Sequence, residues 1–129
     1  MTTIPVMARV VLISDLLGDN DDLIRVAAQR TVAGGIVECV HVVAAEELAL
    51  PPGAHLARDP DAPSWQRAMH RRAHAEYHTR FAAFRAEAAR RWRASGAGYV
   101  EARTDQSVSR LVRQIVSGLG RSASGAVRT

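Results

Sequence analysis

The sequence predicts a three-layer α/β protein in which about three parallel strands are covered by helices on both faces. Three short runs rich in branched aliphatic residues, 8–14, 36–44 and 99–104, have the length and composition of buried strands. These runs alternate with stretches whose apolar residues recur at helical spacing. A strand, a helix and a second strand in that order are typical of a βαβ unit with parallel strands.

The first run indicates which end of the sheet carries a site. Aliphatic residues fill positions 10–13 without polar alternation, which indicates a strand covered on both faces. Asp15 ends the run, and Gly18 opens a polar break before the next helical pattern. Asp15 is therefore predicted at the carboxyl end of the strand, where open α/β sheets build their sites.

A helix and a second strand follow this break. Residues 19–22 are acids and an amide that supply an N-cap and first-turn carboxylates, and the glycine pair at 34–35 ends the helix. The strand over 36–44 contains Cys39, which we interpret as a buried, inert thiol in a protein of a reducing compartment. It also contains His41, which we interpret as a core or sheet-edge histidine satisfied by a backbone group rather than as a ligand.

One long helical pattern dominates the second half of the chain. Residues 46–63 are rich in proline and are predicted to be irregular, and Ser64 is the predicted N-cap of a helix over 65–95. A helix of about 45 Å exceeds what three strands can cover, so we expect it to bend near Tyr77 or to split in two. Its apolar stripe is expected to face the core and consists of Trp65, Ala68, Met69, Ala73, Tyr77, Phe81, Phe84, Ala88 and Trp92.

The chain is predicted to end with a strand, a helix and a tail. The strand over 99–104 stops at Asp105, and Ser107 begins a closing helix. Small and polar residues at 118–129 predict a flexible tail, which leaves a single domain over 1–117. The apolar face of the closing helix is predicted to consist of Val108, Leu111, Val112, Ile115 and Val116.

Charge and hydropathy restrict the functional class. The 17 positive charges are all arginine, the formal net charge is +4, and most of this net charge lies in the segment from Arg67 to Arg93. We interpret that segment as a solvated helix face and do not expect nucleic acid to bind it, although such a surface favours salt-sensitive, sequence-independent binding where binding occurs. The sequence contains neither a run of about 18 apolar residues that would span a membrane nor a signal peptide, so we expect a cytoplasmic protein.

The order of these motifs resembles a known family. A strand ending in Ser14-Asp15, the Pro-Pro-Gly turn at 51–53, the long arginine-rich helix with Tyr77, and Thr104-Asp105 are arranged as in the carboxyl-terminal half of bacterial von Willebrand factor A-like proteins. Members of that family often sit beside MoxR-type AAA+ ATPases. The resemblance covers about residues 8–117 and implies a Rossmann-like sheet, a divalent-metal site at the strand ends, and a role in binding partners or supporting their assembly.

Acidic residues follow each predicted strand. Asp15, Glu46 or Glu47, and Asp105 would be gathered along one rim of a parallel sheet, an arrangement that metal-dependent phosphoryl-transfer enzymes use. Acids at strand ends also serve as helix caps and as turn residues, and we favour that interpretation. The resemblance assigns Asp15 as one metal ligand, but in that family an Asp-x-Ser-x-Ser motif follows an earlier strand, and no such motif precedes Asp15 in this sequence. Asp15 and Asp105 therefore form at most an incomplete site that holds Mg²⁺ weakly, and we expect no resident cofactor.

Two other groups of residues have the composition of chemical sites. His70, His74 and His78 stand four apart, so each adjacent pair has the spacing of Zn²⁺ or Ni²⁺ ligands on a helix. Because arginines surround them, we interpret this row as part of a solvated face. Ser14 beside Asp15 has no histidine in a context that would make it a base, so acyl transfer is not expected.

The sequence therefore favours a non-catalytic interaction or assembly module. We expect the chain to lack the strand that would flank residues 9–14 in a full-length relative. An exposed edge then remains for self-association or for docking onto another subunit, and it consists of Val10, Val11, Leu12 and Ile13. By resemblance, that subunit could be an AAA+ ATPase. The alternative from another class is a small Mg²⁺- or Mn²⁺-dependent phosphoryl hydrolase using Asp15 and Asp105, and a third is a truncated gene product with no activity.

Overall fold

The sheet has the predicted parallel topology. The computed structural model describes residues 4–5, 7–49 and 63–125. Within these ranges a three-stranded sheet has the order β1-β2-β3, and both neighbouring pairs are parallel. In chain order the elements are β1 (Arg9–Ser14), α1 (Asp21–Val32), β2 (Ile36–Val43), α2 (Ala45–Ala49), α3 (Ser64–Ala94), β3 (Gly98–Arg103) and α4 (Val108–Gly125). This arrangement confirms the α/β class and is a partial Rossmann-like fold.

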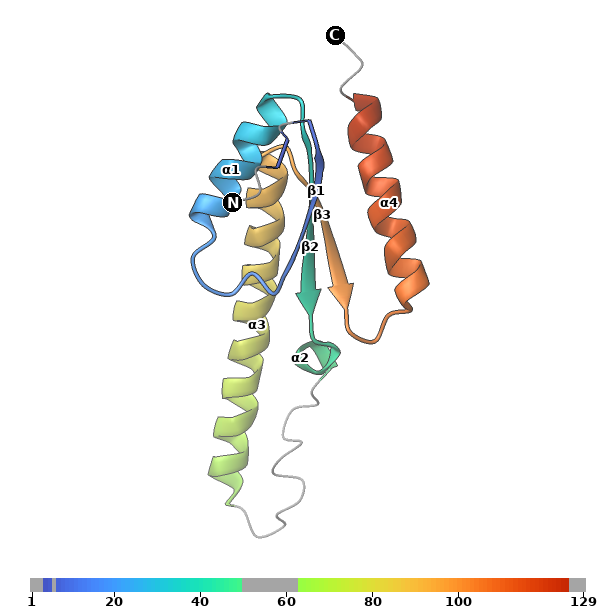
Figure 1. The fold of residues 1–129 in the computed structure, drawn as a ribbon. Helices are drawn as coiled ribbons and strands as arrows, with labels where there is room; N and C mark the ends of the chain where they lie inside the picture. The colour runs from blue at the N-terminus through green and yellow to red at the C-terminus, as the bar shows by residue number, and fades with distance from the viewer. Residues whose placement is uncertain (1–3, 6, 50–62, 126–129) are drawn as a thin grey trace.

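Helices cover the two faces of the sheet unequally. Figure 1 shows α1 and α3 together on one face and α4 on the other. The core lies on the α1 and α3 face, where Trp92 is 2% exposed. Its buried members are Leu16, Ala27, Val37, Cys39, Trp92 and Ala97. Cys39 is fully buried as predicted, and burial raises the pKa of its thiol to about 12, so it stays protonated.

The prediction that β1 is covered on both faces is wrong. Its side chains alternate between exposed and half-buried positions, and Leu12 packs against the core while Val11 and Ile13 point to the other face. On that face α4 lies over β2 and β3 rather than over β1. One face of this apolar strand is therefore exposed.

The long helix and the segment before it differ from the prediction in detail. Helix α3 is one unbroken helix of 31 residues, so the predicted split does not occur, and its N-cap is Pro63 rather than Ser64. In Figure 1 its amino-terminal half projects beyond the sheet, and Trp65 and Met69 of the predicted core stripe are exposed there. Glu46 and Glu47 belong to the short helix α2 rather than to an irregular segment, and the prolines at 51–52 lie outside the described residues.

The closing helix is longer and less buried than predicted. Helix α4 runs to Gly125, so regular structure continues into the segment predicted as a flexible tail after residue 117. The Ser107 hydroxyl accepts a hydrogen bond of 3.4 Å from the Arg110 amide, which supports the predicted start. Leu111 and Ile115 are half-buried, but three residues of the predicted core face are exposed: Val108, Val112 and Val116.

Candidate functional site

A cleft lies at the carboxyl ends of the strands, as the position of Asp15 predicts. Its volume is about 510 Å³, which lies in the range of small-molecule sites. Aromatic side chains form much of its wall, and the rings of Tyr77 and Phe81 stack with their centroids 5.9 Å apart. The lining residues come from the β1–α1 loop, β2, α2, α3 and the β3–α4 turn, and they include Asp15, His41, Glu47, Arg80, Phe84 and Thr104.

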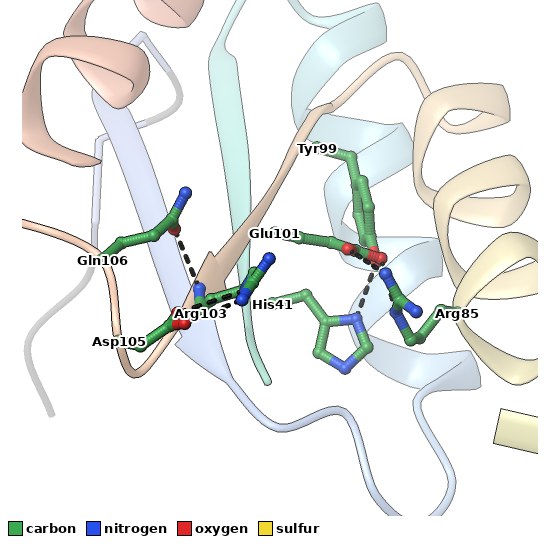
Figure 2. Close-up of polar contacts among 7 residues, drawn as sticks. All are labelled: His41, Arg85, Tyr99, Glu101, Arg103, Asp105 and Gln106. Atoms are coloured by element: carbon green, nitrogen blue, oxygen red, sulfur yellow. Dashed lines mark hydrogen bonds and ion pairs between the residues drawn. The ribbon is translucent and has the colours of Figure 1, made fainter. Parts of the chain in front are cut away.

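A chain of polar contacts runs beneath this cleft from β2 through β3 to α3. The Tyr99 hydroxyl lies 2.7 Å from His41 Nδ1 and 3.4 Å from Glu101 Oε1. Glu101 in turn accepts two hydrogen bonds from the Arg85 guanidinium, at 3.0 and 2.6 Å. Figure 2 shows the four side chains directed toward one another. Sequence reasoning missed this cluster, although the alternation of Tyr99 and Glu101 along β3 places both on one face of the sheet.

The electrostatics of this cluster indicate a structural role. Burial lowers the pKa of His41, and a backbone hydrogen bond with Asp15 opposes that change. The Arg85 guanidinium lowers the pKa of Glu101, while burial raises the pKa of Tyr99. A buried histidine whose Nδ1 shares a hydrogen bond with the Tyr99 hydroxyl is a satisfied group, and this nitrogen is not available to bind a metal.

The acidic residues predicted to form one rim are not assembled into a metal site. Asp15 Oδ1 accepts a hydrogen bond of 3.0 Å from the Leu17 amide, which is the turn role that we favoured. Asp105 forms an ion pair of 2.7 Å with Arg103 (Figure 2), and Glu47 lies 3.5 Å from the Tyr77 hydroxyl. Among the described residues, no three histidine, cysteine or acidic side chains are placed to hold a metal ion. Asp15 and Glu47 line the cleft, whereas Asp105 is held by its own arginine.

The histidine row of α3 is only partly solvated. His70 is exposed, but His74 and His78 are half-buried and their ring centroids are 4.5 Å apart. The arginines nearer the carboxyl end of the helix are engaged within the protein, because Arg90 pairs with Glu87 and Arg91 pairs with Asp21 of α1. Part of the positive charge of α3 is therefore neutralised within the fold.

The predicted edge is present in the structure. Strand β1 pairs with β2 along its whole length, and in the described part of the chain no strand lies on its other side. Ile13 is 65% exposed and Val11 is 40% exposed, whereas Val10 and Leu12 are half-buried. The four residues predicted to form a docking edge therefore divide between an exposed face and a packed face.

The opposite edge of the sheet is bordered by polar side chains. Strand β3 and α4 form a groove between them. Its lining consists of the consecutive β3 residues Tyr99, Val100 and Glu101 and of the α4 residues Arg110, Arg113, Gln114 and Ser117. Charged side chains beside an edge strand oppose pairing with another strand. Strand β1 exposes one charged side chain, Arg9, beside Val11 and Ile13, and is thus the less polar of the two edges.

Comparisons with protein-family models, curated proteins and solved structures found no significant match to this chain. Within the described residues, none of the helices has the length and apolar character needed to cross a membrane.

Proposed function

We propose that this protein is a non-catalytic interaction or assembly module that docks a protein partner along the open edge of β1. The observation that carries the proposal is the exposure of Val11 and Ile13 on a strand that pairs on one side within the described sheet. An unprotected apolar edge offers backbone donors and acceptors for strand addition and aliphatic side chains for burial. A partner that supplies a strand would pair with these backbone groups and bury these aliphatic side chains.

The family resemblance supports the same class of function. In bacterial von Willebrand factor A-like proteins, the motifs that match this chain belong to one half of a larger sheet, and the family's proposed role is in binding or assembly. A partner that completes the sheet beside β1 is consistent with that role. An AAA+ ATPase is a partner class that the resemblance alone suggests.

The phosphoryl hydrolase is the weaker proposal. It requires Asp15 and Asp105 to act together on one metal ion, but Asp105 is ion-paired with Arg103 and does not line the cleft that contains Asp15. Two-carboxylate metal chemistry needs further oxygen ligands around the ion. Neither His41, which is hydrogen-bonded to Tyr99, nor the described acidic residues supply such a set.

Strand addition can be tested with a peptide of residues 8–15 (Ala-Arg-Val-Val-Leu-Ile-Ser-Asp) as the probe. At a protein concentration that keeps the chain monomeric, the peptide should slow hydrogen exchange of the β1 amides, because an added strand pairs with the free edge. Ile13→Lys should weaken this protection about tenfold or more, since a lysine is then placed against the incoming strand.

Val32→Lys is the matched control, because Val32 is an exposed valine at the end of α1, away from the edge. It should leave peptide binding unchanged. Unaltered exchange of β1 in the presence of excess peptide would contradict the docking function, whatever the state of the protein at high concentration.

A further inference from the structure

Strand β3 has backbone groups that point away from the sheet at its outer edge. The Thr104 amide donates to a carbonyl of β2 at 3.1 Å, whereas the Arg103 amide points the other way and donates to the Gln106 side chain at 2.9 Å. Because backbone groups alternate in direction along a strand, the amides and carbonyls of Tyr99 and Glu101 also point away from β2. Within the described residues no strand lies on that side, so these groups can pair with a further strand.

Positive charge borders this edge on both faces of the sheet. On the α3 face, the exposed Arg93 guanidinium lies over the Tyr99 ring, 5.5 Å from its centroid. On the α4 face, the exposed residues Arg110 and Arg113 line the groove of about 500 Å³ between α4 and β3. None of these three arginines forms an ion pair with another described residue. Their charges are therefore available to a partner at the edge.

The carboxylates near the same edge are already neutralised. Glu101 accepts two hydrogen bonds from Arg85, and Asp105 is paired with Arg103, as Figure 2 shows. Helix α4 has neither an aspartate nor a glutamate in its sequence. Once these two ion pairs are cancelled, the charges of the three unpaired arginines remain. The β3 edge therefore has an excess of positive charge that no acidic residue of α4 offsets.

We propose that the β3 edge is a second docking site, and that its partner is an extended acidic peptide that adds to the sheet as a strand. The peptide backbone pairs with the outward groups of Tyr99 and Glu101, and its carboxylates lie beside the three arginines. Charges beside an edge oppose a strand of ordinary composition, but the same charges favour a strand that carries carboxylates. This site is separate from the β1 edge, so the inference goes beyond the proposed function and does not rest on it.

The spacing of the two α4 arginines matches that of side chains along a strand. On one face of a strand, side chains repeat at every second residue, which places them about 7 Å apart. Arg110 and Arg113 are about one helical turn apart, so their Cβ atoms are about 5–6 Å from each other. Their long side chains can therefore reach two successive carboxylates of one strand. A peptide of alternating acidic and aliphatic residues presents its carboxylates in this way.

Hydrogen exchange in the presence of a blocked peptide of alternating glutamate and valine tests the site. At low ionic strength the peptide should slow exchange of the outward amides of Tyr99 and Glu101 and leave the β1 amides unchanged. The same peptide with glutamine in place of glutamate should bind about tenfold more weakly, because it cannot form the two or three exposed ion pairs. Added salt should reduce the difference between the two peptides, since it screens exposed charges.

Arginine variants assign the charge selectivity to the groove. Arg110→Gln combined with Arg113→Gln should weaken binding of the glutamate peptide about fivefold and leave binding of the glutamine peptide nearly unchanged. Arg71→Gln combined with Arg72→Gln is the matched control, because it removes the same charge from exposed positions in the projecting half of α3. This control should bind both peptides as the unmodified protein does.

Three results would overturn the inference. Equal protection by the glutamate and glutamine peptides would show that the edge does not select an acidic strand. Exchange at β3 that is slowed by pyrophosphate or a short single-stranded oligonucleotide, but not by the glutamate peptide, would make the groove a site for another class of anion. Protection of β1 alone by the glutamate peptide would place the acidic partner at the wrong edge. The peptide of residues 8–15 should protect β1 and not β3, so failure at one edge is distinguishable from failure at the other.

Discussion

Replacing Trp92 with alanine should lower the free energy of unfolding by about 3–5 kcal/mol, the usual cost of removing a buried large aromatic side chain. Trp92 is 2% exposed and lies in the cluster that joins α3 to β2 and to the β1–α1 loop. Leu16 and Cys39 in the same cluster are fixed by the backbone of that loop and by the sheet, so they cannot move to fill the space. Urea unfolding followed by circular dichroism measures the loss.

The matched control is Trp92→Phe, which keeps an aromatic ring in the core and should cost less than the alanine variant. Trp65 is a second control, because it is exposed on the projecting half of α3 and Trp65→Ala should change stability by less than about 0.5 kcal/mol. Equal losses for Trp92→Ala and Trp65→Ala would mean that the core has been assigned to the wrong face of the sheet.

Tyr99→Phe should lower the free energy of unfolding by about 1–3 kcal/mol at pH 7.5, because it leaves His41 Nδ1 buried without its hydrogen-bond partner. The Tyr99 hydroxyl is 2.7 Å from this nitrogen, and His41 is 1% exposed. At this pH the histidine is neutral in both states, so the loss reflects the hydrogen bond. Thermal or urea unfolding of the purified variant measures it.

The pH dependence of the wild-type protein gives a second readout of the same group. Because burial lowers the pKa of His41 below its ordinary 6.5, the unfolded chain binds a proton first. The stability contributed by the neutral histidine is complete above pH 6.5 and is lost as the pH falls below that value. A free energy of unfolding that rises as the pH falls from 6.5 to 5.5 would contradict the assigned burial of His41.

The strands were predictable because their composition is nearly independent of context. The runs at 36–44 and 99–104 match β2 and β3 to within a residue or two, and the parallel order follows from the crossover helices. The exposure of Val11 and Ile13 was not predictable from the same pattern. An unbroken aliphatic run indicates that a strand can be buried on both faces, but α4 lies over β2 and β3 and leaves one face of β1 open.

Helix ends and helix faces were less predictable than helix positions. The glycines after 118 and the small residues around them are poor helix formers, yet α4 continues to Gly125. The valines of α4 share helical spacing with Leu111 and Ile115, so the sequence pattern does not distinguish the residues that contact the sheet from those that overhang its edge. That distinction depends on the width of the sheet beneath the helix.

The candidate site was predictable in position but not in composition. Asp15 and Glu47 lie at the carboxyl-end cleft as the strand-end rule predicts. The pairing of Asp105 with Arg103 depends on a turn two residues long, and the contact of Arg85 with Glu101 depends on the rotation of α3 over β3. Neither is encoded in spacing along the chain.

Hydrogen exchange of the two sheet edges, measured over a range of protein concentrations, tests the docking role of β1 most directly. If β1 is the edge that receives another strand, its amides should become more protected as the concentration rises, while those of β3, beside Arg110 and Arg113, should not change. Ile13→Lys should abolish the effect. Protection that appears at β3 instead, or association that leaves β1 exchanging at its low-concentration rate, would contradict the account.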